Sequence, residues 1–253
     1  MPSWIVRAWK KGIITTPYPV GAPTEEEISP TGRPVRVEDP AAFASTATIA
    51  GPRCPTRAIT SAGLDQGKCI RCMRCLPAGF RAGGTIESGN APRDGLVWVA
   101  ATPPVSTAAP APLARIGRSI QVFLMDVGSC NACNLEVLAL ANPYYDVHRL
   151  GISFTNSPRH ADVLVVVGVP TASLIGPLRR TYEAIPAPKA VLAVGACAID
   201  GGIFEGNPGL EVPVRAVVPV DLHVSGCPPP PVAVLDGILR LAGRDRGRSG
   251  GER

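Results

Sequence analysis

The hydrophobic pattern from Ser119 onward alternates between short apolar runs and longer segments of helical period. The runs are rich in Val, Ala, Leu and Ile, which is typical of strands buried in a parallel sheet. Because the two kinds of segment alternate with short links, the pattern predicts an α/β fold with a doubly wound (flavodoxin-like) parallel sheet. We expect strands over residues 120–125, 149–154, 163–169, 190–194 and 217–224, and helices over residues 135–141, 174–185 and 231–242.

The N-terminal part of the chain lacks this alternation. Apolar residues between positions 1 and 20 recur at roughly helical spacing with basic residues between them, which predicts an amphipathic helix on a membrane surface or, as the short and weakly basic segment favours, on a partner subunit. A Pro- and Ala-rich stretch indicates an extended linker. We expect an N-terminal arm over residues 1–42, a first domain over 43–101, a linker over 102–118, a second domain over 119–243 and a disordered tail over 244–253.

Composition narrows the class of protein. The 253 residues begin without the continuous apolar run of a signal peptide. The longest apolar run, residues 161–170, contains Asp162 and is far shorter than the ~20 residues of a membrane span. The net charge of +5 comes from an excess of basic residues in the first 118 positions, but no nucleic-acid motif or interleaved aromatic residues accompany it. We therefore expect a cytoplasmic protein that binds no nucleic acid.

Eight cysteines form two sets of four. The first set is Cys54, Cys69, Cys72 and Cys75, and the second is Cys130, Cys133, Cys197 and Cys227. Four disulfides would suit a secreted protein, but the C-x-x-C spacings favour metal in a reducing compartment. Four thiolates are the ligand set of a [4Fe–4S] cluster. Structural zinc remains an alternative for each set, although Cys₄ zinc sites usually use two short C-x-x-C pairs.

The second set follows the predicted strands. Cys130 and Cys133 come after the first strand, and Cys197 and Cys227 come after two later ones. The four cysteines should therefore lie on loops at the carboxyl edge of the sheet, where open α/β sheets bind their ligands. Glycines next to these positions would let the backbone approach a bulky cluster.

The first set matches half of a two-cluster ferredoxin. Such a protein uses two C-x₂-C-x₂-C-x₃-C-P runs, and the fourth cysteine of each run binds the other run's cluster. Cys54 would be the crossed-over ligand of the cluster held by Cys69, Cys72 and Cys75, and Arg71 and Arg74 between them would offset its negative charge. The other cluster would have lost its four ligands, whose positions are now Ala44, Ala47, Ala50 and Gly79.

Four motifs carry a resemblance to a known family. They are Asp126-Val-Gly-Ser-Cys-Asn-Ala-Cys-Asn-Leu-Glu136, Ser157-Pro-Arg-His-Ala-Asp-Val-Leu164, Gly195-Ala-Cys-Ala-Ile-Asp-Gly-Gly-Ile-Phe204 and Gly226-Cys-Pro-Pro-Pro-Pro231. Residues 119–243 resemble the small electron-transfer subunit of group 4 [NiFe] hydrogenases, formate hydrogenlyase in particular, and the related complex I subunit that holds its terminal cluster. Complex I subunits have adjacent cysteines in the first motif, whereas this chain has C-x-x-C, as the hydrogenases do. Residues 10–19 resemble the start of the ferredoxin-like subunits, so the chain looks like a fusion of an α+β ferredoxin-like domain with a small subunit.

The resemblance implies two [4Fe–4S] clusters, with the second cysteine set holding the proximal one against a large partner subunit. Glu136 matches the family's glutamate after C-x-x-C and would relay protons or, as an alternative, cap a helix or face solvent. Arg159 matches a position near the cluster and would tune it, unless it pairs with Asp162. His160 is expected to serve packing or an interface. Residues 205–216 match nothing in the family.

The function that follows is an electron-relay subunit of a membrane-associated group 4 hydrogenase-like complex, bound to a [NiFe] large subunit, membrane-arm subunits and an iron–sulfur donor or acceptor. It would be peripheral on the inner face of the cell membrane. The alternative is a complex I-like oxidoreductase whose large subunit lacks nickel and uses a quinone or another acceptor. A third hypothesis is a scaffold that binds two zinc ions.

Overall fold

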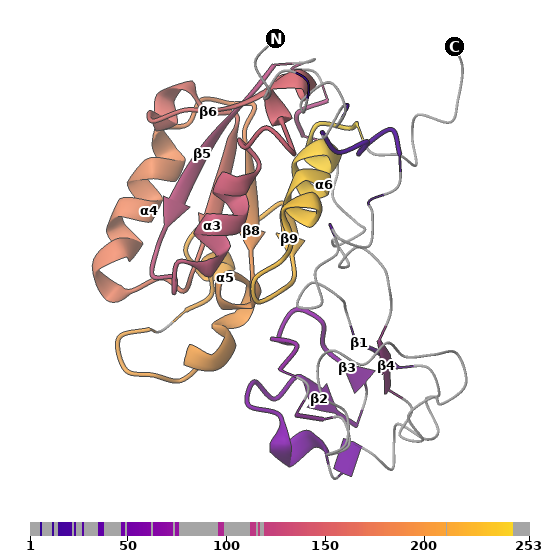
Figure 1. Ribbon diagram of the computed structural model, residues 1–253. Coiled ribbons are helices and arrows are strands. Elements are labelled where there is room, and N and C mark those ends of the chain that lie inside the picture. The colour runs from indigo at the N-terminus through magenta and orange to yellow at the C-terminus, as the bar shows by residue number, and fades with distance from the viewer. Residues whose placement is uncertain are drawn as a thin grey trace.

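The computed structural model has two parts, an α/β domain and a smaller cysteine-rich segment at one end of its sheet (Figure 1). It describes residues 6, 12, 15–21, 23, 27, 35–37, 47–48, 50–61, 63–72, 74–75, 96–98, 112–114, 116, 119–210 and 212–244. The proposed positions Ala44 and Gly79 of a lost ferredoxin cluster, most of the linker and the C-terminal tail lie outside these residues.

The α/β domain is built on a five-stranded sheet in which all neighbouring strands are parallel. Its spatial order is β6-β5-β7-β8-β9. After β5 the chain adds β6 on one side and then β7, β8 and β9 on the other, so the topological switch point lies between β5 and β7. This is the flavodoxin-like order, which confirms the predicted doubly wound sheet. The strands are β5 (Ile120–Asp126), β6 (Ile152–Phe154), β7 (Val163–Val167), β8 (Ala190–Val194) and β9 (Leu222–Val224).

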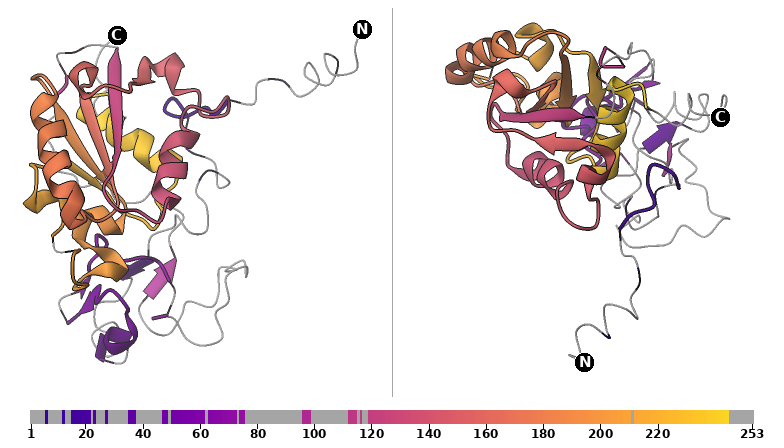
Figure 2. Two further views of the ribbon diagram at one scale, coloured as in Figure 1. Left: turned by 90° about the vertical axis from the view of Figure 1, so that its left-hand side faces the viewer. Right: turned by 90° about the horizontal axis from the view of Figure 1, so that it is seen from above.

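Alternate residues of the three central strands, β5, β7 and β8, pack into two cores, one on each face of the sheet. On β7, Val163, Val165 and Val167 belong to one core, while Leu164 and Val166 belong to the other. Helices α3 (Ala132–Ala139) and α6 (Pro231–Leu241) cover the first face, and α4 (Ala172–Ala184) covers the second (Figures 1 and 2). Each fully buried Val or Leu contributes about 1.5–3 kcal/mol.

Local signals explain where two of the helices begin and end. Helix α6 starts at Pro231, where the missing N–H costs no hydrogen bond, and Gly243 follows it in the left-handed region with a φ of 67°. Helix α4 ends at Ala184, before Pro186 in the sequence. Lys189 Nζ donates to the carbonyl oxygens of Tyr182 and Ile185 at 2.6 and 3.0 Å, which satisfies acceptors left open at that end.

The structure departs most from the prediction at two strands and at one helix that the sequence did not predict. The expected strand over residues 217–224 is shorter, because Val214–Ala216 forms the 3-10 helix η6 and only Leu222–Val224 pairs as β9. The expected strand over residues 149–154 begins as the 3-10 helix η3 (Val147–Leu150) before β6. The five-residue helix α5 (Ala196–Asp200) was not predicted.

The cysteine-rich segment contains little regular structure. A 3-10 helix, η2 (Gly51–Arg53), precedes the hairpin of β2 (Ile59–Thr60) and β3 (Gly63–Leu64), and β1 (Val35–Val37) pairs antiparallel with β4 (Leu96–Trp98). Figures 1 and 2 place residues 50–75 next to α5, at the carboxyl ends of the sheet strands. The ferredoxin-like assignment and the domain boundaries stay predictions.

Residues 15–21 pack on the α/β domain and form turns rather than the end of a helix. Tyr18 is 3% exposed and belongs to the core on the α6 face, where its hydroxyl donates to Asp236 at 2.6 Å. The guanidinium of Arg149 donates to the carbonyl oxygens of Thr16 and Tyr18. This part of the predicted N-terminal arm therefore contributes to the core of the α/β domain.

One further observation concerns membranes. Among the described helices, none combines the length and hydropathy needed to cross a bilayer.

Candidate metal centres

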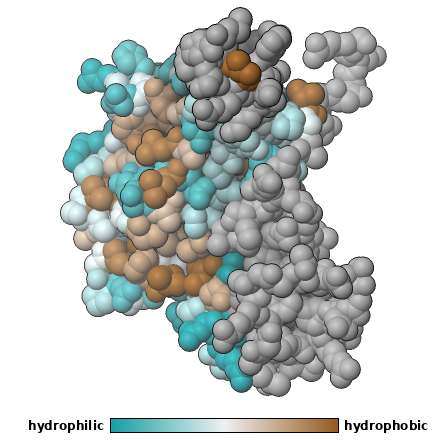
Figure 3. Space-filling view, viewed as in Figure 1, coloured by the Kyte–Doolittle hydropathy of each residue, from teal (hydrophilic) through white to brown (hydrophobic). Residues whose placement is uncertain are grey.

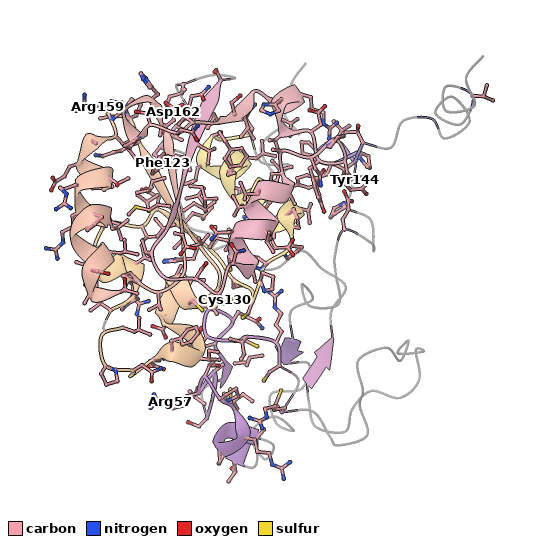
Figure 4. All side chains as sticks on the ribbon, turned by 60° about the vertical axis from the view of Figure 1, so that its left-hand side comes forward. Arg57, Phe123, Cys130, Tyr144, Arg159 and Asp162 are labelled. Atoms are coloured by element: carbon pink, nitrogen blue, oxygen red, sulfur yellow. The ribbon has the colours of Figure 1, made fainter. Side chains whose placement is uncertain are left out.

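The second cysteine set lies at the carboxyl edge of the sheet. Cys130 lies in the loop after β5 and Cys227 in the loop after β9. The other two cysteines are not on loops as expected, because Cys133 lies in the first turn of α3 and Cys197 in α5. The chain thus brings these four cysteines to one edge from three strand ends, with Cys130 facing the cysteine-rich segment (Figure 4).

Glycines leave room for two of these sulfur atoms. A Cβ placed on Gly195 would lie 2.6 Å from Cys133 Sγ, and a Cβ on Gly202 would lie 3.1 Å from Cys197 Sγ. Both glycines also have positive φ angles, 90° and 57°, which side chains rarely adopt. The sulfur atoms therefore occupy the space that any other residue type would fill.

Asp126 organises the loop that carries Cys130. Its carboxylate accepts the backbone N–H groups of Gly128 and Ser129 at 2.8 Å, the Ser129 hydroxyl at 2.7 Å and the side-chain amide of Asn134. Partial burial acts to raise the pKa of Asp126, but these four donors outweigh it and hold the pKa below its usual value. The loop between β5 and α3 is therefore fixed by a charged acceptor at the end of β5.

Burial and neighbouring thiols raise the pKa values of two cysteines in the second set. Burial raises the pKa of Cys133 to about 12, and the nearby Cys197, Cys227 and Cys130 add to the effect. Burial and the neighbouring Cys227 and Cys130 raise the pKa of Cys197 to about 11. Cys133 and Cys197 resist ionisation because they are buried and lie near other thiols, and a bound cation such as iron would be needed to hold them as thiolates.

The first cysteine set surrounds one pocket. The pocket encloses about 340 Å³, counting the part open to solvent. Its walls are formed by the four cysteines together with six neighbours, namely Thr56, Ala58, Ile59, Leu64, Ile70 and Arg71. Cys54 Sγ accepts the backbone N–H of Ala58 at 3.3 Å, the kind of N–H···S contact that stabilises a thiolate. Cys54, distant in sequence, is thus brought to Cys69, Cys72 and Cys75.

Burial also raises the pKa values of thiols in this pocket. The pKa of Cys75 rises to about 11, with Cys69, Cys72 and Cys54 contributing charge repulsion. Among the described residues, no three Cys, His, Asp or Glu side chains converge closely enough to bind a single metal ion. A cubane makes no such demand, because each of its four thiolates binds a different iron atom. Both donor sets fit a cluster of this kind.

Salt bridges join the two cysteine regions. Lys68 Nζ lies 2.8 Å from Asp200 Oδ2 at the end of α5, and Arg215 Nη2 lies 2.9 Å from Asp200 Oδ1. Glu205 pairs with Arg57 at 3.5 Å and with Lys68 at 4.0 Å. Residues 205 and 215 fall in the segment that matched no family motif, and here they contact other parts of the same chain. No signal in the sequence points to these pairs, because charged residues in loops usually face solvent.

Arg71 lies between the two cysteine sets, whereas Arg74 is exposed. Arg71 Nη2 donates to the carbonyl oxygen of Ser225 at 3.1 Å, two residues before Cys227. Of the two arginines expected to offset cluster charge, only Arg71 is therefore buried among the thiols.

Glu136 is half-buried in α3, the helix that contains Cys133. Burial raises the pKa of Glu136, and its charge in turn raises the pKa of Cys133. Leu135 and Leu138 on the same helix are 61% and 54% exposed. Figure 3 shows apolar surface over α3. The second cysteine set therefore lies beside an apolar surface and a carboxylate that favours its protonated form.

Arg159 does not lie near the cysteines. It is exposed in the 3-10 helix η4 (Pro158–His160) that precedes β7, whereas the cysteines follow their strands, so it occupies the opposite edge of the sheet (Figure 4). Asp162, its alternative partner, accepts the backbone N–H of Gln121 at 2.8 Å. This placement corrects the expectation that Arg159 tunes a cluster, and exposed His160 lies at the same edge.

Comparison with known proteins identifies the family. Residues 130–241 match the family described as NADH ubiquinone oxidoreductase, 20 Kd subunit. A probable membrane-bound hydrogenase subunit of Pyrococcus furiosus is 44% identical over 124 residues, which are 49% of this chain and 74% of that protein. The chain belongs to this family. It is therefore an oxidoreductase subunit.

Two other members of the 20 Kd subunit family show its range. An NADH-quinone oxidoreductase subunit of Desulfovibrio desulfuricans is 37% identical over 168 residues, covering 64% of this chain and 88% of that protein. Formate hydrogenlyase subunit 7 of Escherichia coli is 39% identical over 131 residues, but this chain spans only 51% of its length. The family thus includes proteins named for hydrogenases and for quinone reductases.

Proposed function

We propose that this chain is the electron-transfer subunit of a membrane-associated, group 4 [NiFe] hydrogenase-like complex. It relays electrons through two [4Fe–4S] clusters to or from a large subunit that holds the active site. The observation that supports the proposal is the gathering of eight cysteines into two adjacent sets of four, one around a pocket and one at the carboxyl edge of the sheet, each with buried or half-buried thiols.

The ligands follow from the two sets. Cys54, Cys69, Cys72 and Cys75 would hold one cluster, in a ferredoxin-like domain over residues 43–101, and Cys130, Cys133, Cys197 and Cys227 would hold the proximal cluster in the domain over residues 119–243. When bound, each cluster supplies one-electron transfer. The protein's part is to place the thiols, to leave room beside Gly195 and Gly202 and to limit access of water by burial.

The partner of the second set would bind over α3. Leu135, Leu138 and Ile203 are large apolar side chains that are more than half exposed, the first two on the helix that contains Cys133 and the third just after α5. Exposed apolar residues gathered at one place are typical of interfaces. We assign them to the large subunit, with Glu136 at the same contact as a candidate proton relay. We also propose that the chain lies on the cytoplasmic face of the membrane, attached through its partners.

The names of the relatives support both this function and one alternative. The Pyrococcus furiosus relative is named as a membrane-bound hydrogenase subunit, which favours hydrogenase. The Desulfovibrio desulfuricans relative is named as a quinone oxidoreductase subunit and is covered over 88% of its length. In the alternative, the large subunit lacks nickel and reduces a quinone or another acceptor. Nickel-binding C-x-x-C pairs in the neighbouring large subunit would decide for hydrogenase.

Metal analysis and paired substitutions test the proposal. Anaerobically purified protein should contain ~8 iron atoms per chain with matching acid-labile sulfide, and reduction should give the electron paramagnetic resonance (EPR) signals of two clusters. Cys197→Ser should remove only the proximal signal, and the matched variant Cys69→Ser should remove only the other. Stoichiometric zinc without sulfide would refute the relay in favour of a zinc scaffold.

A further inference from the structure

Arg71 is buried and has an unusual backbone conformation. Its side chain is 7% exposed, although it belongs to the loop between Cys69 and Cys72. Its φ angle is 56°, in the left-handed region that non-glycine residues seldom adopt. Such a conformation persists only where surrounding structure imposes it, and such sites often have a functional role. One contact of the Arg71 side chain reaches the segment of the second cysteine set.

That contact leads to the second cysteine set. Arg71 Nη2 donates to the carbonyl oxygen of Ser225 at 3.1 Å. Ser225 is 4% exposed and is followed by Gly226, whose carbonyl oxygen accepts the N–H of Ala196 at 2.8 Å. One hydrogen bond therefore ties the ligand loop of the first set to the segment that carries Cys227 and contacts α5.

The charge of Arg71 lies near both sets. Arg71 lines the pocket of the first set together with its four cysteines, and its guanidinium reaches the carbonyl oxygen of Ser225, two residues before Cys227. One cation thus lies beside the cysteines of the first set and beside the segment that carries Cys227.

We propose that Arg71 is a positioning residue shared by the two cluster sites, which docks the first ligand loop against the segment of Cys227 and favours the reduced state of both clusters through its charge. This inference rests on the proposed function. Four thiolates leave a cluster with net negative charge, and reduction adds one more negative charge. A buried cation beside both sites therefore favours reduction of each.

Arg74 provides the matched control. It lies three residues after Arg71 in the same loop and carries the same charge, but its side chain is exposed. Water and salt screen an exposed charge, so its loss should change the cluster potentials little. A difference between the two arginines therefore reports position rather than net charge.

The test is an EPR-monitored redox titration of the full chain, purified anaerobically with its clusters. In Arg71→Gln, the midpoint potentials of both clusters should shift to more negative values. Arg71→Lys, which keeps the charge, should restore most of each shift, and Arg74→Gln should leave both potentials at the wild-type values. The inference is overturned if Arg71→Gln moves only one potential or neither, or if Arg74→Gln moves them equally.

A second measurement covers the case in which Arg71→Gln does not retain its clusters. If Arg71 touches both sites, the clusters are close enough for their spins to interact. The fully reduced wild-type chain should then show spin–spin broadening that disappears in Cys69→Ser. Absence of this broadening overturns the inference while leaving the two-cluster relay intact, whereas a wild-type chain with fewer than two clusters overturns the relay as well.

Discussion

Lys68 Nζ and Asp200 Oδ2 lie 2.8 Å apart, and this ion pair joins the first cysteine loop to the end of helix α5. The side chain of Asp200 is 15% exposed and also pairs with Arg215. A largely buried carboxylate between two cations should stabilise the protein more than an isolated surface ion pair, whose contribution is about 0–1 kcal/mol. Asp200 is therefore the anionic centre of the contact between the two parts of the chain.

Asp200→Asn should loosen that contact. The substitution keeps the size of the side chain but removes the charge that both Lys68 and Arg215 face, at a cost of about 1 kcal/mol. Hydrogen exchange should speed up about fivefold at the amides of Asp65 and Cys69, which bond to Ala58 and Asp65 within the loop. Glu205→Gln is the control, because its pairs are longer and more exposed and its effect should be smaller. Equal exchange in Asp200→Asn and wild type would contradict this role.

Gly195→Ala should disrupt the second cysteine set alone. The new Cβ would lie 2.6 Å from Cys133 Sγ, closer than atoms in contact allow. Gly206→Ala is a matched control, because Gly206 has a similar φ of 83° but no atom within 4 Å of the new Cβ. Both variants pay a backbone cost of about 1–3 kcal/mol for a side chain at positive φ, and only Gly195→Ala adds a steric clash with a cysteine.

Iron content distinguishes the two glycine variants. We expect Gly195→Ala to retain about half of the wild-type iron and to lose the proximal EPR signal, while Gly206→Ala keeps both signals. Equal loss in both variants would mean that backbone strain, rather than contact with Cys133, controls the site.

Asp126→Asn should destabilise the protein in a pH-dependent way. The pKa of Asp126 is lowered in the folded state, so its contribution is present above the usual carboxylate pKa of about 3.9 and is lost as the pH falls through the lowered value. Because this side chain is largely exposed, we expect a difference in unfolding free energy of only about 1 kcal/mol at pH 7. Urea unfolding of the iron-free chain at pH 7 and near pH 3 measures it. A difference that stays constant over this range would show that the carboxylate charge is not responsible.

Tyr18→Phe tests whether the N-terminal segment belongs to the α/β domain. The variant loses the 2.6 Å hydrogen bond to Asp236 and should cost about 1 kcal/mol, whereas Tyr18→Ala also opens a cavity and should cost about 3–5 kcal/mol. Val20→Ala, at a side chain that is 95% exposed, should change stability by less than about 0.5 kcal/mol. Thermal unfolding of the three variants provides the comparison. A Tyr18→Ala variant as stable as Val20→Ala would separate this segment from the core.

The sequence predicted the parts of the fold that depend on buried periodic runs. Strand β8 was predicted at both ends, because five consecutive apolar residues leave little choice in a sheet covered on both faces. Helix α5 was missed because five residues are too few to show a period. The prediction for strand β9 was too long, because it included Val217 and Val218. These two residues pack against the core on the α4 face without belonging to a strand.

The candidate site shows the same division. The cysteines could be grouped in advance because the ligand spacings are characteristic and the strand order brings strand ends together. The contacts of Arg71, Lys68 and Asp200 could not, because they join segments more than 100 residues apart and their charges look like solvent-exposed loop residues. The motif suggested that Arg159 lies near a cluster. Arg159 precedes strand β7, however, and so lies at the sheet edge opposite the second cysteine set.

The polar contact between the two cysteine regions also gives one polypeptide an advantage over two. Among the described residues, the polar contacts between the two regions are a few partly exposed ion pairs and one buried hydrogen bond, and contacts of this kind contribute little to the association of separate proteins. Within one chain, the tether keeps each half at an effective concentration of about millimolar relative to the other. A weak contact is then formed nearly all the time, and its occupancy does not depend on how much of either half the cell produces.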